Sequence, residues 1–159
     1  MITATAHMFE AQGDVINACK ANRVVADSVV IVRNRRPCAC GMPELHQLTP
    51  ALSVLLDRGL KVALVTDGRM SGASGRVPAA IHVTPEAAAG GALARVQDGD
   101  IVTVDCDAGT LHLHVADAAL VARSNAPTPA AKSGCGRELF ATFRDNVSDA
   151  DCGASIFGN

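Results

Sequence analysis

A glycine-rich loop between two strand-like runs constrains the fold of this chain more than any other stretch. Residues 62–66 form a mostly apolar run typical of a strand, and a second apolar run begins at residue 77. Gly68, Gly72 and Gly75 lie between the two runs. Apolar walls hold such a loop rigidly, and glycines let a ligand approach the backbone closely. We therefore expect the chemistry in this loop, whose polar residues are Asp67, Arg69, Ser71 and Ser74.

The length and charge of the chain limit its partners. Its 159 residues suit a single domain with a hydrophobic core. The formal net charge is −2 and both signs are mixed along the chain, so we expect no basic surface for nucleic acid or anionic lipids. The absence of Trp and Tyr argues against stacking of bases on exposed rings. No apolar run approaches the ~20 residues that span a bilayer, so we expect no membrane partner.

The cysteines predict a reduced, cytoplasmic protein. They lack the regular spacing of a disulfide framework, and no signal segment precedes them. Cys38 and Cys40 are separated by one residue, whereas zinc and redox pairs usually have two residues between them. A metal or redox role for this pair stays an alternative to structural thiols. The six cysteines are Cys19, Cys38, Cys40, Cys106, Cys135 and Cys152.

Alternating and β-branched segments predict strands interleaved with short helices. The expected strands cover residues 2–9, 28–32, 61–66, 101–105 and 110–115, and the last two form a hairpin. One expected helix begins with Asp14 as its N-cap. Another has Thr49 as N-cap and Pro50 at its first position, and ends at Gly59. Further short helices are expected over residues 84–91, 116–123 and 138–143.

The order of these elements predicts the fold class. Short strands between short helices favour an α+β domain, in which a mixed sheet carries short peripheral helices, over a doubly wound sheet. Residues 124–133 contain Pro127 and Pro129 among alanines and are expected to form a Pro/Ala-rich linker within the domain. No internal repeat is present, so we expect residues 1–159 to form one domain.

The residues of the glycine loop admit several chemistries. A strand that leads into a glycine loop can cradle a phosphate, but the Walker lysine and the dinucleotide glycine spacing are absent. Backbone amides and Arg69 still suit a phosphate or carboxylate on a smaller ligand. Ser71 is a candidate nucleophile or base, although no Gly-x-Ser-x-Gly elbow surrounds it. A serine that only stabilises the loop is the alternative.

Four histidines are candidates for a site. His112 and His114 share one face of the expected hairpin strand, which suits metal chelation, but a solvated face opposite the apolar one explains them better. His46 and His82 have stronger claims, because they lie near Glu44 and the glycine loop. For either of these two, a histidine that is only hydrogen-bonded within the fold is the alternative.

Four motifs make the chain similar to a known family. They are Gly-Met-Pro-Glu-Leu-His at residues 41–46, Thr-Asp-Gly-Arg-Met-Ser-Gly-Ala-Ser-Gly at 66–75, Ile-His-Val-Thr-Pro-Glu-Ala at 81–87 and Gly-Cys-Gly-Arg-Glu-Leu-Phe at 134–140. In this order they resemble the C-terminal part of the dihydroxyacid/phosphogluconate dehydratase family over nearly the whole chain. Met70 is similar to the 6-phosphogluconate branch, since the dihydroxyacid branch usually has Phe there. Cys38-Ala39-Cys40 departs from the Pro-Arg-Ala-Asn-like segment that is usual before Gly41.

The resemblance implies a hydro-lyase that dehydrates 6-phosphogluconate to 2-keto-3-deoxy-6-phosphogluconate in the Entner–Doudoroff pathway. In this family an iron–sulfur cluster (4Fe-4S) acts as a Lewis acid on the departing hydroxyl. A deprotonated loop serine, which Ser71 matches, removes the proton next to the carboxylate. The implied fold is a swivelling β-barrel-like β/β/α domain.

The resemblance also implies that this chain works with a larger partner. The cluster cysteines of the family lie in a large N-terminal domain outside this chain, so we expect the cluster to be bound there and no cofactor by this chain alone. We expect a chain that is inactive alone, acts on a small sugar acid phosphate and forms a homodimer when full length. Glu44 matches a carboxylate that faces the metal region in magnesium-containing relatives. The expected substrate-binding residues are Glu44, His46, Asp67, Arg69, Gly72, Ser74 and His82.

Two alternatives to this function stay open. In the first, the chain is part of a dehydratase that acts on another sugar acid or on a dihydroxyacid. The second alternative is a non-catalytic module that binds a sugar acid or a protein partner. A partner-binding module would present an exposed apolar patch.

Overall fold

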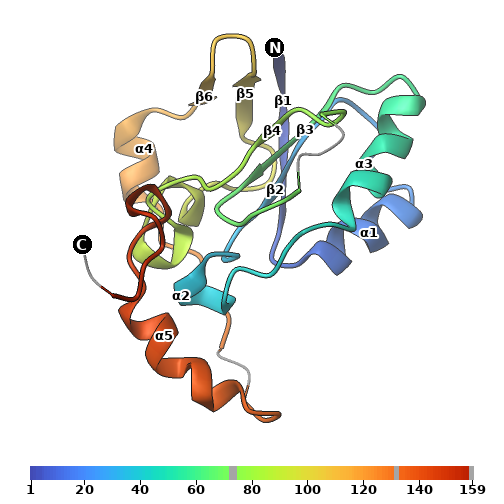
Figure 1. Cartoon of the computed structure of the whole chain (residues 1–159). Helices are drawn as coiled ribbons and strands as arrows, with labels where there is room; N and C mark the ends of the chain where they lie inside the picture. Colours follow the sequence, from blue (N-terminus) through green and yellow to red (C-terminus); the bar gives the residue numbers. More distant parts are fainter. Residues whose placement is uncertain (72–74, 131–132, 158–159) are drawn as a thin grey trace.

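A mixed, six-stranded β-sheet organises the chain (Figure 1). The computed structural model describes residues 1–71, 75–130 and 133–157. The neighbouring strands run in the spatial order β4-β3-β2-β1-β5-β6, in which the first four are parallel and the last two join antiparallel. The strands are β1 (Ile2–Phe9), β2 (Ser28–Val32), β3 (Val62–Thr66), β4 (Ala79–Ala80), β5 (Ile101–Asp105) and β6 (Thr110–Leu113).

Short helices surround the sheet, which confirms the expected α+β class with a mixed, barrel-like sheet. Among the described residues, no helix combines the length and the apolar character needed to cross a membrane. The α-helices are α1 (Gln12–Lys20), α2 (Pro37–Cys40), α3 (Leu48–Asp57), α4 (Asp117–Ala122) and α5 (Ala141–Asn146). The 3₁₀-helices are η1 (Ala87–Ala89), η2 (Ala92–Ala94), η3 (Arg137–Phe140) and η4 (Ala150–Cys152).

The parallel strands are buried on both faces. Helices α1 and α3 pack together on one side of the sheet, where they connect β1 to β2 and β2 to β3 (Figure 1). Val30 and Leu64 are paired in register and belong to this core. Ile31 and Val65, the next residues, face the opposite core with Leu93 of η2. Burial on both faces explains why β2 and β3 read as continuous apolar runs rather than as alternating ones.

The expected hairpin is confirmed at the other edge of the sheet. Strands β5 and β6 pair antiparallel, with Asp105 opposite Thr110. The side chain of Asp105 accepts the backbone N–H of Asp107 and of Ala108, both at 3.1 Å, which closes the turn. Gly109 follows with φ of 65°, a conformation that favours glycine.

Two helices begin earlier than their sequence signals predict. Ala11 occupies the N-cap of α1, so the predicted cap Asp14 lies inside the first turn, where its charge still suits the helix dipole. Gln47 precedes α3, and the predicted cap Thr49 is its second residue. Thr49 instead places its hydroxyl 3.6 Å from the sulfur of Met70. Tertiary contact therefore overrides the local capping signal at this position.

The C-terminal segment, residues 133–157, lies on the surface. It forms η3 and α5, where one helix over residues 138–143 is expected, and α5 packs beside α2 (Figure 1). None of its described residues is buried. Leu139 is 73% exposed, Phe140 55% and Phe143 44%. The segment therefore carries apolar side chains that the described part of the chain leaves uncovered.

Candidate active site

Asp67 fixes the start of the glycine loop. It follows β3 directly and is fully buried. One carboxylate oxygen accepts the backbone N–H of Arg35 at 2.9 Å, and the other accepts those of Asn34 at 3.1 Å and Ala87 at 3.0 Å. A buried carboxylate is costly unless donors satisfy it, so Asp67 holds together its own loop, the turn after β2 and η1.

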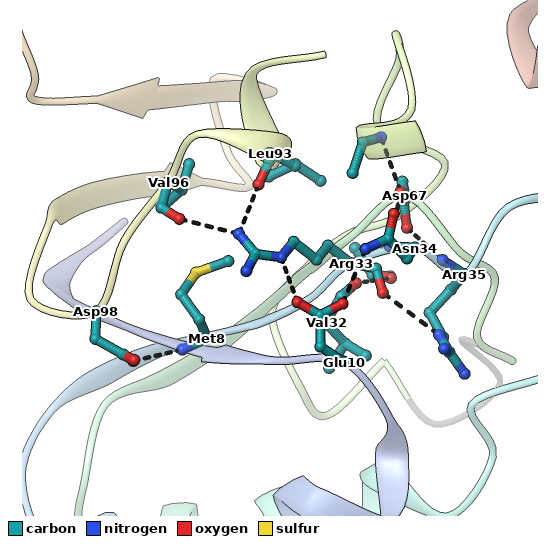
Figure 2. A network of polar contacts seen from close by, with 12 residues as sticks. Met8, Glu10, Val32, Arg33, Asn34, Arg35, Asp67, Leu93, Val96 and Asp98 are labelled. Carbon is teal, nitrogen blue, oxygen red and sulfur yellow. Dashed lines mark hydrogen bonds and ion pairs between the residues drawn. The ribbon is translucent and has the colours of Figure 1, made fainter. Parts of the chain in front are cut away.

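A chain of polar contacts continues from Asn34 to the end of β1 (Figure 2). The side-chain nitrogen Nδ2 of Asn34 donates to one carboxylate oxygen of Glu10 at 2.9 Å, and Nε of Arg33 donates to the other at 2.6 Å. Nη1 of Arg33 donates to the carbonyl oxygens of Leu93 at 3.3 Å and Val96 at 3.1 Å. The turns after β1, β2 and β3 are thus linked to η2 as one rigid support.

Gly68 permits the close approach of two of these turns. A Cβ atom at this position would lie 2.4 Å from Cβ of Arg35, a contact that no side chain can relieve by rotating. The backbone N–H of Gly68 donates to the Thr66 hydroxyl at 2.9 Å, and that hydroxyl donates to the Val32 carbonyl. The absence of a side chain at Gly68 therefore lets the loop leave β3 against the turn after β2.

Glu44 and Ser71 meet across a bridge between two loops. Glu44 pairs with Arg69 in an isolated parallel β-bridge, and the N–H of Leu45 donates to the Arg69 carbonyl at 3.0 Å. One carboxylate oxygen of Glu44 accepts the backbone N–H of Ser71 at 3.1 Å. The glycine loop is therefore held by a side chain that lies 27 residues earlier in the chain.

A surface cavity of 310 Å³ lies over this bridge. Ser71 also lines an adjoining hollow of 180 Å³ with Met70 and Ile81. The larger of the two is of a size that suits a small ligand. The residues around the larger cavity are Glu44, Arg69, Met70, Ser71, Ile81 and His82.

Two residues near this cavity adopt left-handed backbone conformations that are uncommon outside glycine. His82 has φ of 56°, and its N–H donates to the Gly68 carbonyl at 3.0 Å. Met42 has φ of 52°, and its carbonyl accepts Nε of Arg69 at 2.8 Å. Such conformations persist only where surrounding contacts enforce them, and they concentrate at functional sites. The strain thus points to the same place as the cavity.

The structure brings together part of the predicted site. Ser71, Glu44, Arg69 and His82 surround the larger cavity. Buried Asp67, whose carboxylate is occupied by backbone donors, and exposed His46 both lie outside its lining. The predicted residues Gly72 and Ser74 lie outside the described residues.

Sequence reasoning missed two residues of the support. Arg33 and Asn34 were not among the predicted site residues, although they follow a fully buried strand directly. The carboxyl ends of parallel strands meet at one edge of a sheet, which is where ligands bind in such folds. Polar residues after residues 28–32 could therefore have been placed beside Asp67 from the strand pattern alone.

The described residues do not assemble a metal centre. No three His, Cys, Asp or Glu side chains among them lie close enough to hold an ion. All six cysteines are free thiols. Burial, and to a smaller degree hydrogen bonding with Glu86, raises the pKa of Cys38 to about 11, so this thiol stays protonated at neutral pH. The described part of the chain therefore does not fit an iron–sulfur cluster by itself.

Replacing Asp67 with asparagine should destabilise the chain by about 2 kcal/mol, because the new NH₂ group would face backbone donors and leave them unsatisfied. The measurement is urea unfolding followed by circular dichroism. Asp98→Asn is the matched control, since the exposed Asp98 accepts a single backbone N–H, from Met8 at 2.7 Å. Equal losses of stability in the two variants would contradict the central role of Asp67.

Comparisons with known proteins identify relatives along almost the whole chain. A family model described as dihydroxy-acid/6-phosphogluconate dehydratase C-terminal matches residues 1–154. Phosphogluconate dehydratase of Pseudomonas aeruginosa is 56% identical over 158 residues, which are 99% of this chain and 26% of that protein. Phosphogluconate dehydratase of Escherichia coli K12 is 54% identical over 157 residues, which are 98% of this chain and 26% of that protein.

More distant similarity reaches the other branch of the family. Dihydroxy-acid dehydratase of Prochlorococcus marinus is 35% identical over 159 residues, which cover 97% of this chain and 27% of that protein. This chain therefore spans about a quarter of the length of the curated relatives that it matches.

Proposed function

We propose that this chain, which belongs to the dihydroxy-acid/6-phosphogluconate dehydratase family, is the C-terminal domain of a hydro-lyase. The proposed enzyme converts 6-phosphogluconate to 2-keto-3-deoxy-6-phosphogluconate, an Entner–Doudoroff reaction. The observation that carries this proposal is Ser71, held by Glu44 at a cavity in a chain more than half identical to phosphogluconate dehydratases. The identity to the dihydroxy-acid branch is lower, at 35%, which favours the sugar acid as substrate.

The proposed role of Ser71 is that of the base. Its deprotonated hydroxyl takes the proton from the carbon that bears the carboxylate. The electron pair of that C–H bond forms a carbon–carbon double bond while the C–O bond on the next carbon breaks. The departing hydroxide takes up a proton from solvent and leaves as water, and Ser71 returns its proton to solvent. The resulting enol takes up a proton on the carbon that lost the hydroxyl, loses the proton on its oxygen and becomes the 2-keto acid. Glu44 contributes by fixing the Ser71 backbone, which holds the base at the cavity.

The other cavity residues suit the anionic ends of the substrate. In the described part of the chain Arg69 uses only Nε, toward Met42, so its terminal nitrogens suit a carboxylate or phosphate. His82 adds a ring that can donate a hydrogen bond on the same side of the cavity. His46, Gly72 and Ser74 stay proposed substrate-binding residues, on the family resemblance alone. The bonds of Asp67 favour support of the loop over contact with the substrate.

The implied 4Fe-4S cluster belongs, in this proposal, to the rest of the enzyme. The described residues of this chain form no site for it, and the relatives are about four times as long. On the family resemblance, Glu44 is a candidate contact to a metal that the rest of the enzyme holds. We further propose a cytoplasmic homodimer as the full-length form.

The direct test is an assay of the full-length enzyme that contains this domain. We expect 6-phosphogluconate to yield a 2-keto acid, detected with a carbonyl reagent, and a branched 2,3-dihydroxy acid to react far more slowly. The chain alone should give no product. Preference for the branched acid would assign the enzyme to the other branch, and turnover by the chain alone would remove the need for a second domain.

The exposed apolar side chains of the C-terminal segment predict contact with the rest of the enzyme. Leu139, Phe140 and Phe143 should bind a hydrophobic dye in the chain alone and be covered in the full-length protein. Replacing Leu139 and Phe140 with serine should lower dye fluorescence of the chain several-fold, whereas replacing the distant, 71% exposed Val121 should have little effect. Unchanged fluorescence in the double variant would argue against this surface.

A further inference from the structure

Arg36 is a buried cation with unusually few close partners. Its side chain is 1% exposed, yet Nε and Nη1 form no hydrogen bond within the described part of the chain. Nη2 lies 3.4 Å from a carboxylate oxygen of Asp149, and Nε lies 4.0 Å from one of Glu86. A buried guanidinium is costly unless charges nearby compensate it, so its position depends on these two carboxylates.

Glu86 connects Arg36 to the support of the active-site loop. Glu86 is 2% exposed, and its neighbour Ala87 donates one of the three backbone hydrogen bonds to Asp67. The residue before Arg36, Arg35, donates another. Arg36 and Asp67 therefore both connect the turn after β2 to the turn at residues 86–87. Arg36 does so through its ion pair with Glu86, and Asp67 through the backbone N–H groups of Arg35 and Ala87.

Asp149 connects Arg36 to the C-terminal segment. Its carbonyl accepts the N–H groups of Cys152 and Ala154, both at 3.0 Å, so it anchors the turn of η4. Two residues before Asp149, the carbonyl oxygen of Val147 lies 3.8 Å from the sulfur of Cys38 in α2. The described residues of 133–157 are exposed or half-buried, and these contacts join the segment to residues 36–40.

The turn that begins at Arg36 leads directly to Glu44. The Arg36 carbonyl accepts the N–H of Cys40 at 3.0 Å, and the chain reaches the bridge to Arg69 four residues later. We propose that Arg36 is a positioning residue that ties the C-terminal segment, through Asp149, to the turns that hold Asp67 and to the loop that carries Glu44. Docking of the C-terminal segment then sets where Ser71 lies; this step rests on the function proposed above.

The test compares Asp149→Asn with Asp151→Asn in the full-length enzyme. Asp151 is an exposed carboxylate in η4, the 3₁₀-helix that Asp149 precedes as N-cap, and it makes no ion pair within the described residues, so it is a matched control. Asp149→Asn should lower kcat about tenfold with KM changed less than about twofold, because a small displacement of the base affects the reaction more than binding. Asp149→Glu should recover most of the lost kcat.

A second measurement does not depend on turnover. Amide hydrogen exchange at Arg35 and Ala87, the donors to Asp67, should become about tenfold faster in Asp149→Asn and stay unchanged in Asp151→Asn. Faster exchange with unchanged kcat would reduce Arg36 to a structural role and overturn the proposal, as would identical behaviour of the two variants. If the wild-type enzyme dehydrates no sugar acid, the proposed function fails, while exchange at these two amides still decides whether Asp149 stabilises the turns.

Discussion

Full-length enzyme in which Ser71 is replaced by alanine should lose turnover of 6-phosphogluconate by about 100- to 10,000-fold, the usual contribution of a positioned base. Ser71 lines the cavity together with Glu44 and Arg69, and its backbone N–H is held by Glu44 at 3.1 Å. Alanine keeps that N–H and removes only the hydroxyl. The loss should therefore appear in kcat, while KM stays within a few-fold, because the anionic groups of the substrate are bound elsewhere in the cavity.

The control for this prediction is Ser124→Ala. Ser124 is exposed and lies outside both hollows that Ser71 lines, so its hydroxyl should be dispensable. Iron content and unfolding temperature should match the wild type in both variants, which separates a lost base from a lost cofactor or fold. Near-normal turnover of Ser71→Ala with full iron content would exclude Ser71 as the base.

Replacing Gly91 with alanine should lower the free energy of unfolding by at least about 3 kcal/mol. A Cβ atom at Gly91 would lie 1.8 Å from the carbonyl oxygen of Pro85 and 3.0 Å from that of Glu86. The N–H of Gly91 donates to the Glu86 carbonyl at 3.0 Å, so the turn cannot open without losing this hydrogen bond. Denaturant unfolding of the chain, followed by circular dichroism, measures the effect.

Gly13→Ala provides the opposite expectation at a second glycine. Gly13 lies within α1, and nothing lies within 4 Å of a Cβ atom placed there. Alanine is the better helix former, so this variant should gain up to about 1 kcal/mol. If both variants change stability in the same direction and by similar amounts, steric contact at Gly91 is not the cause of its effect.

The sequence by itself determined five of the six strands and singled out the glycine loop as the candidate site. The run that became β1 was predicted from its loose alternation, that of β2 from its β-branched residues bounded by polar ones, and that of β3 from its apolar residues. The hairpin followed from alternation on either side of an Asp-Ala-Gly turn. The loop after β3 was identified from its glycines and polar residues, and the cavity at Ser71 lies there.

Only the tertiary structure decided which of these residues contact one another and which are buried. Glu44 contacts Ser71 because a β-bridge joins two loops that are far apart in sequence. Asp67 was predicted to bind substrate, but it is buried and its carboxylate accepts backbone N–H groups. The sequence also placed the first residue of α3 too late: Thr49, the predicted cap, is the second residue of the helix and contacts the sulfur of Met70. Local patterns specify which segments form strands and turns. Which polar groups meet depends on burial and on pairing between distant segments, and the sequence pattern records neither.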